Sequence, residues 1–393
     1  MNLSSLTKIN KNFCNICDEK NLSNFFKISS LPYKTINNFS YKDLNHKNNK
    51  LFKTKYCNNC GAICLNNGVN FDKLYKNFKN YQKHSKFIKK EINKIINKSK
   101  KITLINIGKS KELLNTRSLK KINYINFDPC LNQEDNVNKK FSSLYKYSKK
   151  YKNKVDVILI ENFLSNIPNI SQTIKVISKM LNPDGKILIY THYGTSNLKK
   201  VDINRFYFEH VYYFSITSLL FLFKKFELYQ SKIKFFEDKD FVFLIFQKKP
   251  MHINKELRNQ ISEESKISKE DYIKFVNIIK KNKKKLSSIF NKNNFDIYGY
   301  GCSIGAISII KTYSIEDKIL TLIDDKPLIN EVNFGKKNIK VSKLDQIKFS
   351  NRKKLILNLI PRHNKIILSN ISSYMKKGDL YINMIKGLEI KKF

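Results

Sequence analysis

The chain has 393 residues, of which 41% are hydrophobic and 12% aromatic, so it can bury a substantial core and is long enough for two or three domains. No apolar run approaches the roughly 18–20 residues that a membrane span needs, and residues 241–246 (FVFLIF) have the length of a strand. The N-terminal residues lack the continuous apolar stretch of a secretory signal. We therefore expect a cytoplasmic protein without a membrane segment.

The formal net charge of +43 suggests a nucleic-acid partner. Of the 75 basic residues, however, only five are arginine, the side chain that favours bidentate contacts to phosphates and bases. The lysines are scattered through every segment, alongside abundant Asn, Ile, Phe and Tyr. A basic, zinc-bearing nucleic-acid binder is therefore the rival interpretation, while some affinity for anionic ligands, including phosphorylated ones, is expected.

Four of the seven cysteines stand in two C-x-x-C pairs, Cys14 with Cys17 and Cys57 with Cys60. Each pair can present two thiolates to one metal ion from a tight turn, and two pairs complete a tetrahedral shell. Without a secretion signal, disulfides are the less favoured use of these thiols. The sequence predicts structural rather than catalytic zinc, because four thiolates leave no open position for water. The remaining cysteines, expected in the core or in loops, are Cys64, Cys130 and Cys302.

Residues 86–98, in which isoleucines recur at helical spacing among Lys and Glu, predict an amphipathic helix that leads into the next domain. Behind it, short apolar strands alternate with helical patterns, which predicts a parallel, doubly wound sheet. A helix is expected at 171–181, ending at the turn 182–185. The expected strands of this α/β domain cover 101–108, 122–127, 155–160 and 186–190, with an antiparallel pair at 227–235 and 241–247.

Polar residues follow these strands where a ligand would bind. In a doubly wound sheet the ligand lies at the carboxyl ends of the strands, near the point where the strand order reverses. Gly108 ends the first strand, and Asp128 follows the second, at the spacing of about 20 residues from which an acid can bind ribose hydroxyls. The third strand ends at Glu161 and Asn162.

The loop after Gly108 (KSKE) contains no second glycine. A pyrophosphate needs the close backbone approach that further glycines permit, so NAD and FAD are disfavoured. S-adenosylmethionine carries no phosphate and tolerates a less glycine-rich turn. One glycine is compatible with this cofactor and also with a doubly wound domain that binds no ligand.

The last third begins with residues 253–290, whose helical pattern, rich in Lys and Glu, suggests a connector. Residues 295–305 then predict a strand, a glycine turn with Gly299, Gly301 and Gly305, and a helix. The turn is equally compatible with a cradle for nucleotide phosphates and with packing alone. Further strands, which together predict a second, smaller Rossmann-like domain, are expected at 319–325, 354–359 and 380–384.

The stretch 202–223 (DINRFYFEHVYYFSITSLLFLF) places a phenol, a carboxylate and an imidazole within four residues, at Tyr207, Glu209 and His210. Such side chains can hold, orient and move a proton near neutral pH. Because short clusters of titratable residues are common, spacing alone favours core packing and a local hydrogen bond of the histidine. The apolar run that follows predicts a helix capped by Ser215 or Thr217.

Taken together, these motifs resemble one family, the sugar C-methyltransferases that act on nucleotide-linked 4-keto-deoxyhexoses. The resemblance covers nearly the whole chain, and its most specific match is 202–215, which is similar to the family signature FDxIYxEHxxYFS. Residues 155–168 resemble a segment of the form DVIxxxNxLxHIP, and 71–85 (FDKLYKNFKNYQKHS) resembles a segment that bears a Tyr and a Ser. The cysteine pairs match the family's zinc-binding domain, and 295–305, IDDKP and NFGKKNIKVSKLD match its C-terminal domain.

The resemblance implies a class I methyltransferase that uses S-adenosylmethionine, with the N-terminal cysteines as zinc ligands and the C-terminal domain helping to hold the nucleotide sugar. The resemblance further implies that a tyrosine and a serine, which precede the first strand in the sequence, approach the cofactor or the substrate. The residues predicted to bind the cofactor are Tyr81, Ser85, Gly108, Asp128 and Asn162.

The resemblance also implies that Tyr207 and His210 act on the hydrogen beside the substrate ketone, with Glu209 as an orienting partner. A 4-keto group acidifies that hydrogen, a base removes it, and the enolate attacks the methyl group of S-adenosylmethionine. An imidazole steered by a carboxylate, with a phenol donating to the ketone oxygen, would supply the base and the oxyanion stabiliser. Which of Tyr207 and His210 takes the proton is left open.

Three positions depart from the family pattern. Phe208 stands where members often carry His or Asp, and Asn166 replaces the histidine of HIP. Asn106 replaces the acid of the cofactor loop EIGxNxG. The first two changes bear on substrate choice and the third on cofactor affinity, so a non-catalytic relative that binds sugar nucleotides is a further alternative.

We therefore predict an α/β protein of three parts: a four-cysteine zinc module at 1–80, a doubly wound methyltransferase domain at 81–250, and a Rossmann-like, nucleotide-sugar-binding domain with a helical connector at 251–393. The predicted cofactors are S-adenosylmethionine and structural zinc. The predicted partner is a nucleotide-linked sugar, with membrane and nucleic acid disfavoured. The sugar, its nucleotide, the methylated atom (carbon, oxygen or nitrogen) and the oligomeric state are left open.

Overall fold

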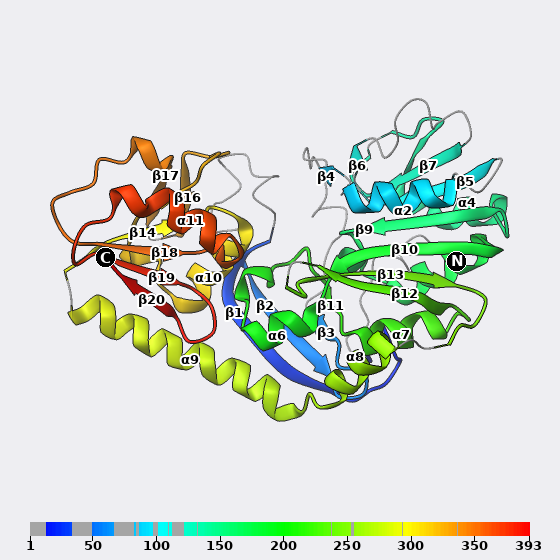
Figure 1. The fold of residues 1–393 in the computed structure, drawn as a ribbon, viewed down its shortest axis with the longest axis horizontal. Helices are drawn as coiled ribbons and strands as arrows, with labels where there is room; N and C mark the ends of the chain where they lie inside the picture. Colours follow the sequence, from blue (N-terminus) through cyan, green and yellow to red (C-terminus); the bar gives the residue numbers. More distant parts are fainter. Residues whose placement is uncertain are drawn as a thin grey trace. The chain divides into compact units, whose positions relative to one another are not determined.

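The chain folds into two compact units, shown in Figure 1. The first comprises Met1–Asn24, Lys55–Thr195 and Val211–Ile267, and the second comprises Phe25–Thr54, Ser196–His210 and Ser268–Phe393. The boundary therefore falls inside the signature stretch 202–215. The predicted domain limits at residues 80 and 250 stay a prediction. The computed structural model describes residues 13–33, 49–66, 82–83, 86–96, 101–108, 110–111, 122–131, 133–236, 238–252, 255–292, 294–335 and 337–393.

The core of the first unit is a sheet with the strand order β12-β13-β10-β9-β5-β7-β8. Neighbours from β8 to β10 are parallel, and β13 is antiparallel to both β10 and β12. The strand order reverses at β5, which confirms the predicted doubly wound sheet. The strands are β5 (Ile102–Ile107), β7 (Ile122–Asp128), β8 (Asn138–Lys140), β9 (Val155–Glu161), β10 (Leu181–His192), β12 (Tyr229–Phe236) and β13 (Phe241–Gln247).

The parallel strands are near-continuous apolar runs because both faces of the sheet are covered. On one face, Ile88 and Ile92 of α2 pack against Leu104, Val157 and Leu188 of the sheet. The apolar spacing of α2 thus has the predicted role. The helices of this unit are α2 (Lys86–Ile96), η4 (Phe141–Ser143), α4 (Leu144–Lys150), η5 (Leu164–Asn166), α5 (Ile170–Met180), α7 (Ile216–Lys224) and α8 (Lys255–Ser265).

Two predicted boundaries can be compared with the structure. Ser215 caps α7, because its Oγ accepts a hydrogen bond from the Ser218 N–H at 2.9 Å. The prediction that β10 begins at residue 186 was wrong, since the strand begins at Leu181, directly after α5. Its register against β9 shifts between Leu181 and Lys186, so the expected turn lies inside the strand as a bulge.

Several short elements accompany the main sheet. β3 (Ile63–Leu65) pairs with β11 (Tyr212–Tyr213), and β4 (Gln82–Lys83) pairs with β6 (Ser110–Lys111). The boundary between the units passes through β1 (Leu22–Pro32), β2 (Asn49–Cys57) and α6 (Gly194–Lys200). None of the helices in the described part of the chain is long and apolar enough to cross a membrane.

The second unit contains a sheet with the order β16-β17-β15-β14-β18-β19-β20, in which the two edge strands are antiparallel to their neighbours. The inner strands are parallel and their order reverses at β14, in agreement with the predicted Rossmann-like pattern. The strands are β14 (Asp296–Tyr300), β15 (Ile319–Ile323), β16 (Glu331–Asn333), β17 (Asn338–Ser342), β18 (Lys354–Asn358), β19 (Leu380–Asn383) and β20 (Glu389–Lys392). The helices are η6 (Ile203–Arg205), α9 (Lys269–Lys292), α10 (Ile304–Tyr313), η7 (Glu316–Lys318), η8 (Leu344–Gln346), η9 (Pro361–His363), α11 (Asn364–Ile371) and η10 (Ser372–Tyr374).

The glycine turn of the second unit is used for packing. A Cβ atom on Gly305, in the first turn of α10, would overlap the carbonyl oxygen of Asn204 and lie 2.7 Å from its side-chain Cγ. Asn204 is also held from the other side, because its Nδ2 donates to the carbonyl oxygen of Leu359 at 2.8 Å. Gly299 is closed in by the side chains of Leu322 and Leu359. The chain itself therefore occupies the place beside Gly305, and of the two interpretations of this turn the contacts support packing.

Replacing Gly305 with Ala is expected to destabilise the second unit by about 1–3 kcal/mol, because the new methyl group collides with Asn204. In an open helix the same change would stabilise by up to about 1 kcal/mol, so the sign of the effect identifies the close contact. The measurement is urea unfolding followed by circular dichroism. Thr312→Ala, on the same helix, is the control and should leave stability nearly unchanged; an equally stable Gly305→Ala protein would contradict the packing role.

Candidate active site and metal centre

The register of three adjacent strands defines one edge of the first sheet. Ile107 of β5 pairs with Phe127 of β7 on one side and with Ile160 of β9 on the other. The next residues of all three strands therefore reach the same edge, beside the reversal of strand order where doubly wound sheets bind ligands. We call it the cofactor edge. Its residues are Gly108, Asp128, Glu161 and Asn162.

Gly108 occupies a position that only glycine fills easily. Its φ of +130° lies outside the range of ordinary L-residues, and a Cβ atom there would lie 3.0 Å from the Cβ of Phe163. Its N–H donates to the carbonyl oxygen of Phe127 at 2.9 Å, which continues the ladder between β5 and β7. The backbone thus turns away from the sheet directly after β5.

Asp128 places a buried carboxylate at the end of β7, with 3% of its surface exposed. Its Oδ1 accepts the backbone N–H of Cys130 at 2.7 Å, a local bond that orients the side chain. A carboxylate held at this position can accept hydrogen bonds from ribose hydroxyls. Asp128 therefore lies at the cofactor edge, and its role in binding the cofactor stays a prediction.

Asn162 adds a second polar group at the end of β9. Its backbone is left-handed (φ +52°), which Asn tolerates better than most residues, and its N–H donates to the carbonyl oxygen of Tyr190 at 2.7 Å. Its side-chain Oδ1 is buried and has no hydrogen-bond partner among the described residues. A buried acceptor without a donor costs about 1–3 kcal/mol, which a ligand amine or ammonium group would offset. The edge therefore fits S-adenosylmethionine, whose ammonium and ribose groups match an amide acceptor and a carboxylate.

Asn106, which replaces the family's acid, has a structural role within the sheet. Its Nδ2 donates to the Oδ1 of Asn126 at 2.7 Å, and Asn126 in turn donates to the Oδ1 of Asn138 at 3.2 Å. The three amides connect β5, β7 and β8. A carboxylate at position 106 could not donate to Asn126, which gives a physical reason for the amide.

Tyr81 and Ser85, the other two predicted cofactor residues, lie outside the described part of the chain. Between them, Gln82 and Lys83 form β4, which pairs in parallel with Ser110 and Lys111 of β6. Since β6 begins two residues after Gly108, β4 lies beside the segment that follows the cofactor edge.

The structure brings Tyr207 and His210 together within the second unit. The Tyr207 hydroxyl lies 3.2 Å from His210 Nε2, and the two ring centroids are 4.3 Å apart. The other ring nitrogen, Nδ1, lies 2.9 Å from the carbonyl oxygen of Arg205. Because a carbonyl only accepts, Nδ1 carries the proton in the neutral ring and Nε2 accepts the Tyr207 O–H.

Burial is the main influence on both groups. It lowers the pKa of His210 to about 3, with the Arg205 charge acting in the same direction. Burial also raises the pKa of Tyr207, and Glu209 adds to this effect while Arg205 opposes it. At neutral pH the pair is therefore an uncharged phenol that donates to an uncharged imidazole. The hydrogen bond joins the phenol oxygen to Nε2, so it is the path along which a proton would move between the two groups.

The orienting group of His210 differs from the one suggested by the sequence. The carbonyl oxygen of Arg205 contacts Nδ1, and sequence analysis missed it because a main-chain carbonyl has no residue signature. Glu209 is half-buried, and its predicted role as the orienting partner stays a prediction.

The two remaining departures from the family pattern are both accommodated in the interior. Phe208 has 2% of its surface exposed and packs against the rings of Tyr33 and Phe52, at centroid distances of 5.1 and 5.3 Å. Asn166 is also buried, and its Oδ1 accepts a hydrogen bond from the Ser165 hydroxyl at 2.7 Å. At position 208, apolar packing therefore takes the place of the polar side chain expected from the resemblance.

The two cysteine pairs form matching turns. In the first turn, the N–H of Asp18 donates to the carbonyl oxygen of Cys14 at 2.9 Å. In the second, the N–H of Gly61 donates to the carbonyl oxygen of Cys57 at 3.0 Å. Asp18 and Gly61 both have positive φ, 65° and 70°. Each turn therefore curls its backbone around the pair, and both sulfurs of a pair face the same point.

The four sulfur atoms of Cys14, Cys17, Cys57 and Cys60 lie within 4.8 Å of one another. The closest pairs, Cys14 with Cys60 and Cys17 with Cys57, are 3.7 and 3.5 Å apart. Thiolates bound to zinc at about 2.3 Å in a tetrahedron are separated by about 3.8 Å. The cluster therefore fits a four-coordinate zinc ion.

Helix α7 contacts both cysteine turns. At its N-terminus the Ser215 hydroxyl donates to the carbonyl oxygen of Cys60 at 2.9 Å. At its C-terminus the Lys225 ammonium donates to the carbonyl oxygen of Ile16 and pairs with the carboxylate of Asp18. The serine of the signature stretch therefore links the cysteine cluster to the helix that follows it.

Part of the first unit, including the cofactor edge, is similar to a known protein family. Residues 81–230 match a family model described as a methyltransferase domain. The match includes Gly108, Asp128 and Asn162, together with Tyr207, Glu209 and His210. No curated protein matches the chain.

Solved structures similar to the chain include a carbon methyltransferase, CurJ, at 14% identity, and the citrinin polyketide synthase CMeT domain at 10%. The matches cover 41% and 38% of this chain and 53% and 47% of those chains, each with a TM-score of 0.28. This chain thus spans about half the length of these two proteins. An S-adenosylmethionine-dependent methyltransferase from Mesorhizobium loti matches at 8% identity over 37% of this chain and 90% of its own, also with a TM-score of 0.28.

Protein purified without a chelator is expected to contain about one zinc ion per chain, because four thiolates saturate one tetrahedral site. Replacing Cys60 with Ser should reduce the zinc content well below one. The measurement is elemental analysis of the purified chain. Cys302→Ser removes a buried thiol outside the cluster and should keep the metal; zinc-free wild-type protein, or an equal loss in both variants, would argue against the site.

Proposed function

We propose that the protein is an S-adenosylmethionine-dependent C-methyltransferase that acts on a nucleotide-linked keto-deoxysugar. The observation that carries the methyl-transfer part is the cofactor edge. There the Asp128 carboxylate and the unpaired Asn162 Oδ1 follow β7 and β9, the two strands that flank β5, within the region that matches a methyltransferase domain. The keto-sugar part rests on the signature stretch and on the hydrogen-bonded pair within it.

In this proposal, Asp128 binds the ribose hydroxyls of the cofactor and Asn162 accepts a hydrogen bond from its ammonium group. Gly108 allows the backbone to turn close to the ligand. Bound S-adenosylmethionine would supply an electrophilic methyl group to a carbon nucleophile. The chain's own task is to create that nucleophile by moving a proton.

Tyr207 and His210 move this proton as a relay. The phenol oxygen takes the hydrogen from the carbon beside the ketone, while the phenol proton passes to His210 Nε2. The carbon–hydrogen electron pair becomes the enolate, and the histidine becomes an imidazolium whose Nδ1–H is held by the Arg205 carbonyl oxygen. Burial makes an imidazolium without a counter-charge unfavourable. The negative charge of the enolate offsets this cost once it forms. The relay places Tyr207 next to the substrate and His210 behind it.

The proposed zinc ion is structural in this account. Four thiolates complete its coordination, so it has no position for a substrate or a water molecule. Its contribution is to hold the two cysteine turns against α7.

The test is methyl transfer from labelled S-adenosylmethionine to nucleotide-linked 4-keto-deoxyhexoses, with the product identified by mass spectrometry and NMR. Tyr207→Phe and His210→Gln should each lower turnover by about 10²–10⁴-fold, the usual contribution of acid–base groups. Both variants should bind the cofactor as the wild type does, because neither residue belongs to the cofactor edge.

His252→Gln, which changes an exposed histidine, is the matched control and should retain full activity. Full activity in Tyr207→Phe or His210→Gln would contradict the relay. If the wild type binds the cofactor but methylates no keto-sugar nucleotide, the substrate class is wrong. The non-catalytic alternative predicts sugar-nucleotide binding without methyl transfer.

A further inference from the structure

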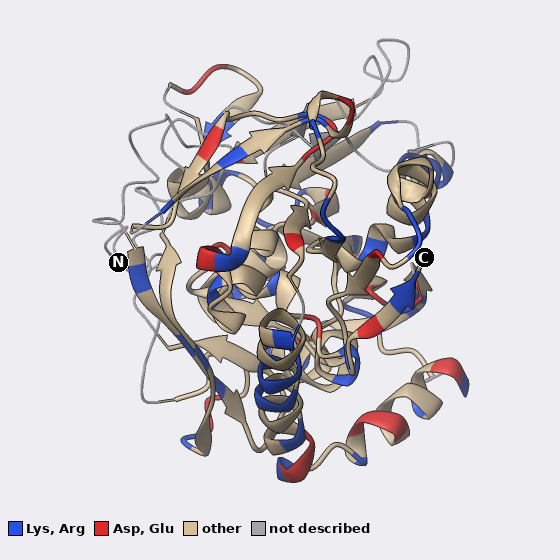
Figure 2. Ribbon diagram, turned by 90° about the vertical axis from the view of Figure 1, so that its left-hand side faces the viewer, with Lys and Arg blue, Asp and Glu red and all other residues tan. Residues whose placement is uncertain are grey.

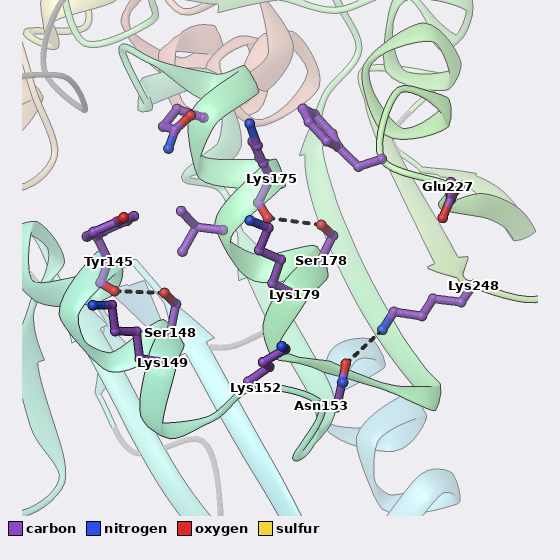
Figure 3. Close-up of a pocket in the computed structure, with 13 residues that line it drawn as sticks. Tyr145, Ser148, Lys149, Lys152, Asn153, Lys175, Ser178, Lys179, Glu227 and Lys248 are labelled. Carbon is purple, nitrogen blue, oxygen red and sulfur yellow. Dashed lines mark hydrogen bonds between the residues drawn. The ribbon is translucent and has the colours of Figure 1, made fainter. Parts of the chain in front are cut away.

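A cavity of about 590 Å³ opens in the first unit, and Figure 3 shows the residues that line it. Its walls come from α4, α5, the segment between α7 and β12, and the residue that follows β13. Asn153 precedes the start of β9 and Lys179 precedes the start of β10, so the cavity lies at the amino ends of these strands. It is therefore separate from the residues proposed to bind S-adenosylmethionine.

The cavity is basic beyond the general bias of the chain. Figure 2 shows Lys and Arg spread over many helices and strands, with acidic residues between them. Of the 13 residues that line the cavity, five are lysines and one is acidic, whereas 70 of all 393 residues are lysines. The share of lysine in the lining is thus about twice that of the whole chain. The lysines are Lys149, Lys152, Lys175, Lys179 and Lys248, and the acid is Glu227.

Helix dipoles explain only part of this cluster. Lys149 and Lys179 lie in the last turns of α4 and α5, where a cation is favoured by the helix C-terminus. Lys175 lies one turn earlier, and Lys152 and Lys248 are not on a helix. Three of the five lysines therefore need another explanation.

The ammonium groups are not neutralised by acidic side chains. Within the described residues, Lys149, Lys152, Lys175 and Lys179 form no ion pair. Figure 3 shows these side chains among the residues that line the cavity. Lys248 is half-buried, and its Nζ donates to the carbonyl oxygen of Leu181 at 2.6 Å. Burial lowers the pKa of Lys248 below its ordinary value, and the nearby Glu227 carboxylate opposes this effect only in part.

We propose that this cavity binds a small molecule with two or more phosphate groups. Four exposed ammonium groups and a half-buried fifth suit several negative charges, and the volume is within the range of about 300–1,000 Å³ of small-molecule sites. A hollow of this limited volume suits a compact polyphosphate better than the extended backbone of a nucleic acid, which needs a groove. The proposal does not depend on the methyl-transfer activity.

The test is calorimetric titration of the full chain with inorganic pyrophosphate at near-physiological salt. The wild type should show saturable binding at one site. Lys175→Ala/Lys179→Ala, which removes two lysines four residues apart on α5, should weaken binding at least tenfold. The matched control is Lys280→Ala/Lys284→Ala, which removes two exposed lysines with the same spacing on α9 and should keep wild-type affinity.

Equal weakening in both double variants would overturn the proposal, because only net charge would then matter. The proposal is also overturned if the wild type shows no saturable binding and pyrophosphate leaves its melting temperature unchanged. A single-stranded oligonucleotide should not displace pyrophosphate. If it does, and if both double variants weaken this displacement equally, the lysines form a nucleic-acid surface instead. Competition by a nucleoside diphosphate identifies a nucleotide as the source of the phosphates, and its failure to compete identifies a free polyphosphate; either result supports the site.

Discussion

The register of β5 between β7 and β9 is the constraint on which this account depends. Because Ile107 pairs with residues of both neighbours, the three strands end together and present Gly108, Asp128 and Asn162 at one edge. A shift of one residue in either pairing would move Asp128 or Asn162 out of line and turn its side chain to the other face of the sheet. The amide chain from Asn106 to Asn126 holds this alignment, so the residue that departs from the family's acid also preserves the edge.

The cysteine cluster and the signature stretch are connected through α7. Ser215 ends the signature, caps the helix and donates to the carbonyl oxygen of Cys60, while Lys225 at the other end contacts the first cysteine turn. Within the first unit, a metal ion bound by the four thiolates would therefore stabilise a helix far away in the sequence. Tyr207 and His210 lie in the other unit, where Asn204 packs against Gly305. The signature is therefore divided: its residues up to His210 belong to the second unit, and those from Val211 belong to the first.

Much of this arrangement could be predicted from local patterns. The apolar runs predicted the strands of both sheets, the paired cysteines predicted the cluster, and Ser215 was one of two predicted caps. The rest depends on contacts that leave no pattern. The carbonyl oxygen that orients His210, the start of β10 at Leu181 and the contact of Asn204 with Gly305 all involve main-chain atoms, which every residue type carries. Glycines at a turn therefore could not reveal whether a phosphate or the chain itself fills the space.

The most direct test of the central claim is calorimetric titration of the folded, full-length chain with S-adenosylhomocysteine, comparing wild type with Asp128→Asn. The account predicts saturable, micromolar binding to the wild type and at least a tenfold loss in Asp128→Asn, because the amide cannot accept two ribose hydrogen bonds as a carboxylate does. Asp184→Asn, which changes an exposed acid away from the edge, should bind as the wild type does. No binding to the folded wild-type chain, or equal binding by Asp128→Asn, would contradict the assignment of the cofactor edge.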